Sequence, residues 1–213
     1  MTNNNVELLG WYGGDDAIAL SAWTSTSRDL DEDKRSRIPK LINQLWSAEP
    51  VPHGTPFEKG IVHFLVDTDI ASHIHMLKHR LSNINAESAR YKELKEDKYY
   101  LPTDWPEEWV DKLSEYSAQG NLLYHQCLLE LTPLLGRKRA KESARFFKGY
   151  NSRIAADVMF NMRSFHNFIN QRMDGHAQLE IREIARQMLD AVKSIEGNPF
   201  EHTLAAWGFD KIS

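Results

Sequence analysis

A long helical pattern between shorter strand-like runs constrains the fold of this chain more than any other feature. Residues 107–135 have mostly helical periodicity, and the pattern ends at Gly136. Residues 61–66 form a compact β-rich run before it, and residues 153–162 predict a second strand after it. Strands and long helices that do not alternate as βαβ units favour one α+β domain over residues 1–213, with a mixed sheet flanked by long helices. The alternative is an insertion of residues 107–135 into a smaller α/β core.

Capping residues and helix breakers predict the other elements. Asp15 and Asp16 predict the cap of a short helix at residues 17–20, and Asp69 predicts the cap of a helix that runs to about residue 79. Residues 49–56 contain three prolines and predict a shaped loop, and the polar residues 82–88 predict a second loop. Helical periodicity predicts further helices at residues 41–46, 138–147, 164–171 and 177–195.

Composition favours a cytoplasmic protein that binds small anions. No apolar run approaches the roughly 20 residues of a membrane span, and residues 1–6 lack a basic-then-apolar signal pattern. The one cysteine, Cys127, excludes an internal disulfide, and its apolar helical surroundings predict a packing role. The formal net charge is -4, yet basic residues form local islands. This pattern favours a small anion in a defined pocket over nucleic acid bound along a face.

The first candidate ligand site is a basic cluster near the polar stretch. Lys78, His79 and Arg80 are consecutive, and Ser88 follows after seven residues, with Arg90 two positions further on. The planar guanidinium group of arginine can bond two phosphate oxygens at once, and the ammonium group of lysine adds a compact positive charge. Three adjacent groups of this kind cannot all face one way, so they favour an extended phosphorylated ligand. Ser88 and Arg90 would share a face if their stretch is extended. The alternative is a solvated basic helix end, which the helix dipole favours.

The second candidate site is the amide- and arginine-rich segment 161–172. Arg163 and Asn167 are four positions apart, so they project from one face of a helix. Phe165 and Phe168 fall on another face and are predicted to be core. Amide side chains carry both a hydrogen-bond donor and an acceptor, so they can bond the mixed donor and acceptor edge of a heterocycle. The alternative is a set of hydrogen-bonded interface residues.

Two rival functions rest on weaker patterns. His75 and His79 are four apart, which on a helix can bind zinc, but no His-Glu-x-x-His pattern and no third ligand accompany them. The basic run at residues 137–141 motivates a nucleic-acid-binding module, but no recognised motif frames it. We therefore predict no metal, no nucleic acid and no membrane partner.

Taken together, the blocks resemble the ThyX family, the flavin-dependent thymidylate synthases. Lys78-His79-Arg80 with Ser88 is similar to the family's Arg-His-Arg-x7-Ser motif. Residues 53–58 resemble the family's loop ahead of its strand, and residues 161–180 resemble its C-terminal motif of Asn, Arg, Asn, Arg and His-Ala-Gln. The separate blocks occur in the family's order between about residues 22 and 180.

The resemblance implies a subunit of a homotetramer with FAD and dUMP bound at subunit interfaces. The implied reaction is the reductive methylation of dUMP to dTMP, with NADPH as reductant and 5,10-methylenetetrahydrofolate as one-carbon donor. The positions that match FAD-contacting residues of the family are Ser25, Thr55, Lys78, His79, Arg80, Glu87, Asn161, Arg163 and Asn167. Those that match positions around dUMP are His75, Lys78, Glu87, Ser88, Ala89, Arg90, Arg145 and Arg172.

Arg172 is the position to which the resemblance assigns a catalytic role. Uracil becomes electrophilic at C6 when negative charge on its N3 and O2 edge is stabilised, and a guanidinium can do this. Three positions depart from the family pattern, because Lys78 replaces Arg, His75 replaces Gln and Ala86 replaces Glu. Lysine cannot form the bidentate fork of arginine. The alternative function is therefore a related enzyme that makes a variant one-carbon-modified pyrimidine nucleotide.

Overall fold

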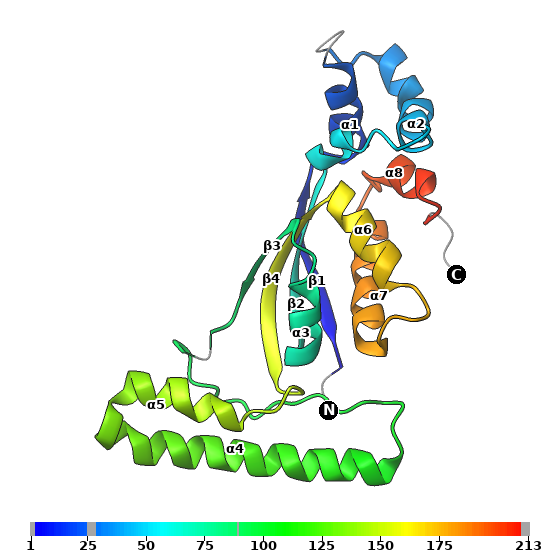
Figure 1. Cartoon of the computed structure of the whole chain (residues 1–213). Helices are drawn as coiled ribbons and strands as arrows, with labels where there is room; N and C mark the ends of the chain where they lie inside the picture. The colour runs from blue at the N-terminus through cyan, green and yellow to red at the C-terminus, as the bar shows by residue number, and fades with distance from the viewer. Residues whose placement is uncertain (1–2, 25–28, 89, 210–213) are drawn as a thin grey trace. The chain divides into compact units, whose positions relative to one another are not determined.

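The computed structural model describes residues 3–24, 29–88 and 90–209 (Figure 1). Within these ranges the strands form one sheet in the order β1-β2-β4-β3, and neighbouring strands run antiparallel. The strands are β1 (Asn5–Tyr12), β2 (Ile61–Asp69), β3 (Ser82–Ala86) and β4 (Arg153–Asn161). The helices are α1 (Gly14–Trp23), α2 (Glu32–Trp46), α3 (Ile70–Met76), α4 (Glu107–Leu135), α5 (Arg137–Ala144), α6 (Met162–Arg172), α7 (Leu179–Lys193) and α8 (Glu201–Ala206), with the 3₁₀ turns η1 (Thr55–Lys59) and η2 (Arg145–Phe147). The combination of this sheet with many helices confirms the α+β class, but the prediction of a mixed sheet was wrong, because the sheet is antiparallel.

The prediction of a polar loop at residues 82–88 was wrong, because its first part is strand β3. Asparagine and serine are depleted in strands, so the composition pointed away from this assignment. β3 lies at the edge of the strand order next to β4, and its alternate side chains Asn83 and Asn85 are exposed. An edge strand with one face in water tolerates such residues, and pairing with β4 decides the conformation.

The chain is divided into two compact units. Unit 1 comprises Met1–Asn5, Val66–Lys78 and Asn85–Ala156, and unit 2 comprises Val6–Leu65, His79–Ile84 and Asp157–Ser213. Each of the four strands contributes residues to both units.

Unit 1 is built around the pair of helices α4 and α5, which lie side by side (Figure 1). Tyr124 and Leu128 of α4 are buried against Ala140 and Ala144 of α5, whose small side chains allow the helices to approach closely. Cys127 is partly buried and packs against this cluster, as its apolar surroundings predicted. In the described ranges 3–24, 29–88 and 90–209, no helix combines the length and apolar character needed to cross a membrane.

Unit 2 has an aromatic core between its strand segments and α6. Phe64 of β2 stacks on Phe165 of α6 at a ring-centroid distance of 5.8 Å, and Phe160 of β4 lies 5.2 Å from Phe168. All four rings are buried, as predicted for Phe165 and Phe168. Helix α7 packs beside α6 and buries Ile181, Ile184 and Met188. The opposite face of α6 therefore stays available for the polar residues of the candidate site.

Asp15 has a different partner from the one that the sequence predicted. It lies inside the first turn of α1, whose N-cap is Gly13, and it makes no cap for that helix. Its buried carboxylate instead accepts hydrogen bonds at the start of α8, from His202 N at 2.7 Å and from Thr203 N and Oγ1 at 3.1 and 2.6 Å. Burial raises the pKa of Asp15, while the hydrogen bond from Thr203 opposes that shift. Asp15 thus joins the start of α8 to α1.

An aromatic cluster in unit 2 surrounds the imidazole of His166. Its ring centroid lies 4.4 Å from that of Trp46, 4.9 Å from that of Trp207 and 6.0 Å from that of Phe209. These rings offer no counter-charge, so burial lowers the pKa of His166 from about 6.5 to about 4.

We expect His166 to make folding sensitive to acid. Between pH 4 and 6.5 the folded protein binds fewer protons at His166 than the unfolded chain does. Stability present above pH 6.5 is therefore lost as the pH falls toward 4, by about 2 kcal/mol for a partly buried group. His166→Gln should flatten the pH dependence of the unfolding free energy, measured by urea titration. His176→Gln, at an exposed histidine, should leave it unchanged, and an equal slope in His166→Gln and wild type would contradict the assignment.

Candidate active site

Two motif blocks that are far apart in the sequence meet in unit 2 at His79 and Arg172. Arg172 Nε, at the end of α6, donates to His79 Nε2 at 2.8 Å. His79 is buried, and its ring lies edge-on to Phe168 at 4.9 Å. Because Nε2 accepts this bond, the imidazole is neutral and carries its proton on Nδ1. The half-buried Arg172 guanidinium is thereby oriented by its buried neighbour His79. Among residues 3–24, 29–88 and 90–209, its other nitrogen atoms make no hydrogen bond, so they can bond the edge of a ligand.

The loop at residues 53–57 reaches the same helix through Arg163. A Cβ atom at Gly54 would lie 2.8 Å from Arg163 Nε, so the Arg163 side chain lies directly against the loop backbone where Gly54 has no side chain. Arg163 also bonds Glu58 Oε1 at 2.8 Å. The exposed Thr55 begins η1 immediately after Gly54. This arrangement brings Thr55 and Arg163, two of the predicted FAD positions, next to each other.

Two amide side chains follow Arg163 along α6. Asn161 caps the helix, with its Oδ1 accepting from Ser164 N at 2.9 Å, so its amide nitrogen remains a donor. Asn167 is exposed four positions after Arg163, as predicted, and its Oδ1 accepts from Gln171 Nε2 at 3.0 Å. Both amides therefore have their oxygen engaged and offer N–H groups to a ligand.

Unit 1 holds the residues predicted around a nucleotide phosphate. Arg90 bonds Glu142 of α5, with Nε and Nη2 each 3.2 Å from Oε1. The hydrogen bond from Arg90 lowers the pKa of Glu142. Arg145 is exposed three positions further along, at the end of α5. Glu142 therefore holds Arg90 near Arg145, although these residues are far apart in the sequence.

Ser88 and Arg90 do not form the extended stretch that would place them on one face. Arg90 N donates to Ser88 Oγ at 3.3 Å, and Tyr91 N and Lys92 N donate to Ser88 O at 3.0 and 2.9 Å. These bonds form a turn, so the extended conformation that a shared face would require is not present. The turn still keeps the Ser88 hydroxyl and the Arg90 guanidinium on one short segment.

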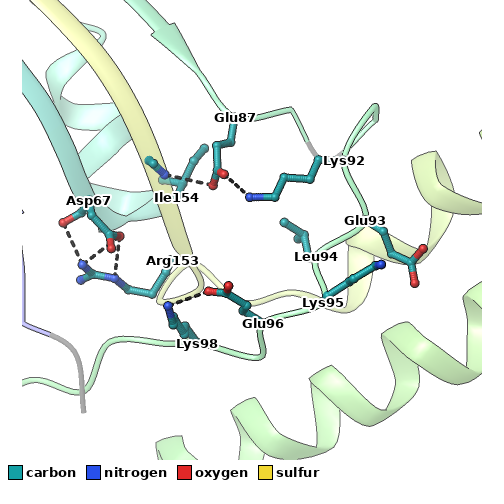
Figure 2. A pocket seen from close by; sticks show the side chains of 11 residues that line it. Asp67, Glu87, Lys92, Glu93, Leu94, Lys95, Glu96, Lys98, Arg153 and Ile154 are labelled. Carbon is teal, nitrogen blue, oxygen red and sulfur yellow. Dashed lines mark hydrogen bonds and ion pairs between the residues drawn. The ribbon is translucent and has the colours of Figure 1, made fainter.

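Glu87 lines a pocket of about 450 Å³ in unit 1 (Figure 2). Its carboxylate bonds Lys92 Nζ at 2.5 Å and accepts from Ala155 N at 3.3 Å. The wall of the pocket beyond it is formed by Arg153, paired with Asp67 at 2.9 Å. The pocket therefore has a mixed-charge lining next to the Ser88 turn.

The remaining predicted positions form no further cluster. Lys78 and Arg80 are exposed on either side of the buried His79, in the turn between α3 and β3, so the three groups do face different ways. His75 is half-buried on α3. Ser25 and Ala89 lie outside the described residues.

The rival patterns have other structural roles. Helix α3 ends at Met76, so His75 and His79 do not share a helix and lack the geometry on which a zinc pair would rest. Within residues 3–24, 29–88 and 90–209, no three His, Cys, Asp or Glu side chains gather as a metal site. In the basic run, Arg137 bonds Glu93 at 2.5 Å and Lys141 bonds Tyr91 O at 2.8 Å. Part of that run therefore fastens α5 to the loop after β3.

Three carboxylate or ammonium partners were not anticipated from the sequence, namely Glu58, Lys92 and Glu142. Each lies beside a predicted ligand residue and holds it in place. Glu142 lies three positions before Arg145 in the sequence, and this spacing could have indicated that Glu142 is near the nucleotide site. Lys92 belongs to a charged run that otherwise resembles a solvated surface.

Comparison with known proteins agrees with the family resemblance that the sequence motifs indicated. The family model described as "Thymidylate synthase complementing protein" matches residues 7–196. A flavin-dependent thymidylate synthase of Pseudothermotoga lettingae is 30% identical over 200 residues, covering 89% of this chain and 85% of the relative. One from Sulfolobus acidocaldarius is 29% identical over 201 residues, covering 89% and 72%. The solved UMP/dUMP methylase PolB of Streptomyces cacaoi, bound with 5-Br dUMP, superposes with a TM-score of 0.82 at 24% identity, covering 100% of this chain and 98% of that chain. This last likeness shows a shared fold.

Proposed function

Because this chain belongs to the flavin-dependent thymidylate synthase family, we propose that it binds FAD and methylates dUMP to dTMP. The observation that supports this most directly is the 2.8 Å bond between Arg172 Nε and His79 Nε2. It joins the two motif blocks that carry the resemblance, which lie 93 residues apart.

The donors of unit 2 suit a flavin dinucleotide. Arg80 and Arg163 supply guanidinium groups that match a pyrophosphate. The amide nitrogens of Asn161 and Asn167, whose oxygens are already bonded, can donate to the edge of a heterocycle. When bound, reduced FAD supplies the hydride that the pyrimidine accepts. The protein's own task is to bind both ligands and to place charge where the pyrimidine ring requires it.

The residues of unit 1 suit the nucleotide. Ser88 offers a hydroxyl, and Arg90 and Arg145 offer cations, which is the chemistry that a phosphate monoester requires. Arg172 is proposed to stabilise the charge that develops on the N3 and O2 edge of uracil as C6 accepts the hydride. Because flavin chemistry requires no enzyme nucleophile, the packed Cys127 fits this route.

We expect the purified protein to bind FAD noncovalently and to be yellow, or to become so when FAD is added. The reason is the donor set around His79, Arg163 and Asn167. Quenching of FAD fluorescence during titration measures the binding, and acid or heat should release intact FAD. A colourless protein that leaves the fluorescence of added FAD unchanged would contradict the proposed function.

The electron and carbon donors are part of the proposal and rest on the family resemblance. We propose NADPH as the reductant and 5,10-methylenetetrahydrofolate as the one-carbon donor, in a cytoplasmic enzyme. Anaerobic bleaching of the flavin by NADPH, compared with NADH, checks the first donor. Formation of dTMP only when the folate is present checks the second.

We propose a homotetramer with ligand sites at subunit interfaces. Helix α4 supports an assembly, because Tyr116, Leu122, Leu129 and Leu134 are 62%, 60%, 77% and 75% exposed. Large apolar side chains that are exposed on one long helix are often covered at a protein interface. Light scattering should give the mass of four chains, and a monomeric mass at working concentration would contradict the assembly.

A variant product is the second candidate, and the replacement at Lys78 favours it. Lys78 is exposed beside the buried His79, at a position where the family has arginine. A point charge there holds a ligand less firmly than a bidentate fork. Mass spectrometry of the nucleotide formed from dUMP distinguishes a methyl group from another one-carbon substituent.

A further inference from the structure

Glu87 is held at both carboxylate oxygens within unit 1. Lys92 Nζ lies 2.5 Å from Oε1, and Ala155 N of β4 donates to Oε2 at 3.3 Å. The backbone is fixed as well, because Glu87 N donates to Ala155 O at 2.9 Å. Figure 2 shows the Glu87 side chain directed toward Lys92, with a dashed line for their bond. The bond to Lys92 is the short, charge-assisted one, so it dominates the orientation of the carboxylate.

Lys92 also closes the turn that carries Ser88. Its backbone N donates to Ser88 O at 2.9 Å, next to the 3.0 Å bond from Tyr91 N. Lys92 therefore contacts both ends of the segment that contains the predicted nucleotide residues, by its backbone at Ser88 and by its side chain at Glu87.

The charge of Glu87 makes this contact significant. A nucleotide monophosphate is anionic, and an uncompensated carboxylate in its site would oppose binding through like-charge repulsion. Glu87 raises the pKa of Lys92 through their hydrogen bond, so the ammonium stays charged. The pair thereby presents an oriented acceptor without a net negative charge.

We infer that Lys92 is a positioning residue of the nucleotide site, which orients the Glu87 carboxylate and neutralises its charge toward dUMP. This inference rests on the proposed function, specifically on Glu87 facing the nucleotide. Lys92 itself contacts Glu87 and the turn, so it acts through them.

Lys95 supplies a matched control. It lies three positions after Lys92 and lines the same pocket. Among the described residues, its ammonium makes no ion pair or side-chain hydrogen bond, whereas Lys92 makes both with Glu87. A change at Lys95 removes the same charge from the same stretch and leaves the Glu87 carboxylate held.

The test compares dUMP binding in the FAD-loaded enzyme. Lys92→Met should raise the Kd and the KM for dUMP about tenfold and leave kcat within about threefold, because the contact serves ground-state and transition-state binding alike. Lys92→Arg should restore most of the affinity, and Lys95→Met should bind dUMP as the wild type does. Thermal unfolding of each variant identifies any loss of fold, and Lys92→Gln then serves as the second replacement.

A double-mutant cycle separates positioning from a general effect on the loop. In a Glu87→Gln background, Lys92→Met should cause no further loss of dUMP affinity. An equal loss in that background, or an equal loss in Lys95→Met, would overturn the inference while wild-type dUMP binding upholds the proposed function. Failure of the wild type to bind dUMP would overturn both.

Discussion

Arg172→Ala should keep its FAD and still be reduced by the nicotinamide, but it should lose about a hundredfold in the rate of dUMP-dependent flavin reoxidation. Removing one guanidinium contact to developing charge in a desolvated site costs on the order of 3 kcal/mol in the barrier. The structure holds this guanidinium on His79 at 2.8 Å, so it is oriented before the substrate arrives. Anaerobic single-turnover reoxidation at saturating dUMP, with folate present, separates this step from binding.

Two variants serve as references for the Arg172 experiment. Arg172→Lys should recover part of the rate, because the ammonium group keeps the positive charge but cannot form the two parallel hydrogen bonds of a guanidinium group. Arg182→Ala removes an arginine of α7 whose Nη1 makes a 3.5 Å contact with Gly175 O, and it should reoxidise at the wild-type rate. Wild-type reoxidation in Arg172→Ala would mean that another group activates the pyrimidine, with Arg145 and Lys78 as the next candidates.

Arg153→Met should lower the free energy of unfolding by about 3 kcal/mol, the largest stability effect that we expect. The buried Arg153 guanidinium donates to Asp67 Oδ1 at 3.0 Å, Asp67 O at 2.8 Å and Asn3 O at 3.0 Å. It also donates to the buried Asn4 side chain at 3.3 Å. Methionine fills a similar volume but donates no hydrogen bond to Asp67 or to Asn3 O. For a chain of this length, the change corresponds to a fall of roughly 10 °C in Tm.

The control for Arg153 is Lys98→Met, which breaks the exposed pair with Glu96. Water screens the charges of an exposed pair, so such a pair contributes little to stability. The urea-unfolding curve of Lys98→Met should therefore nearly coincide with that of the wild type. Arg153→Lys should fall between the two, because it keeps the charge and loses the fork. A loss below about 1 kcal/mol in Arg153→Met would show that water replaces these bonds at little cost.

Elements set by local periodicity could be predicted from the sequence. The strand at residues 61–66, the strand at residues 153–162 and the helix that carries Arg163 and Asn167 are all present. Their apolar spacing or capping residues act within a few positions of the chain. Asp69 is the cap of α3 for the same reason, with its side chain 2.8 Å from Ser72 N.

Features set by distant contacts could not be predicted. β3 is a strand because it pairs with β4, against its own composition. Asp15 caps α8, whose His202 is 187 positions away. The bond between Arg172 and His79 is also long-range, so the resemblance indicated both residues but not that they touch. Glu87 and Lys92 are five positions apart in the sequence, but their ion pair could not be predicted because it depends on the turn at Ser88.

The most direct test of the proposed function is the fate of dUMP in a single anaerobic turnover. The FAD-loaded protein is reduced with NADPH and mixed with dUMP and 5,10-methylenetetrahydrofolate. Flavin absorbance and the nucleotide product are then followed together. The proposed function predicts that the flavin reoxidises only when dUMP and the folate are both present, and that dTMP forms in an amount equal to the flavin oxidised. Recovery of unchanged dUMP from a fully reduced, FAD-loaded enzyme would contradict it.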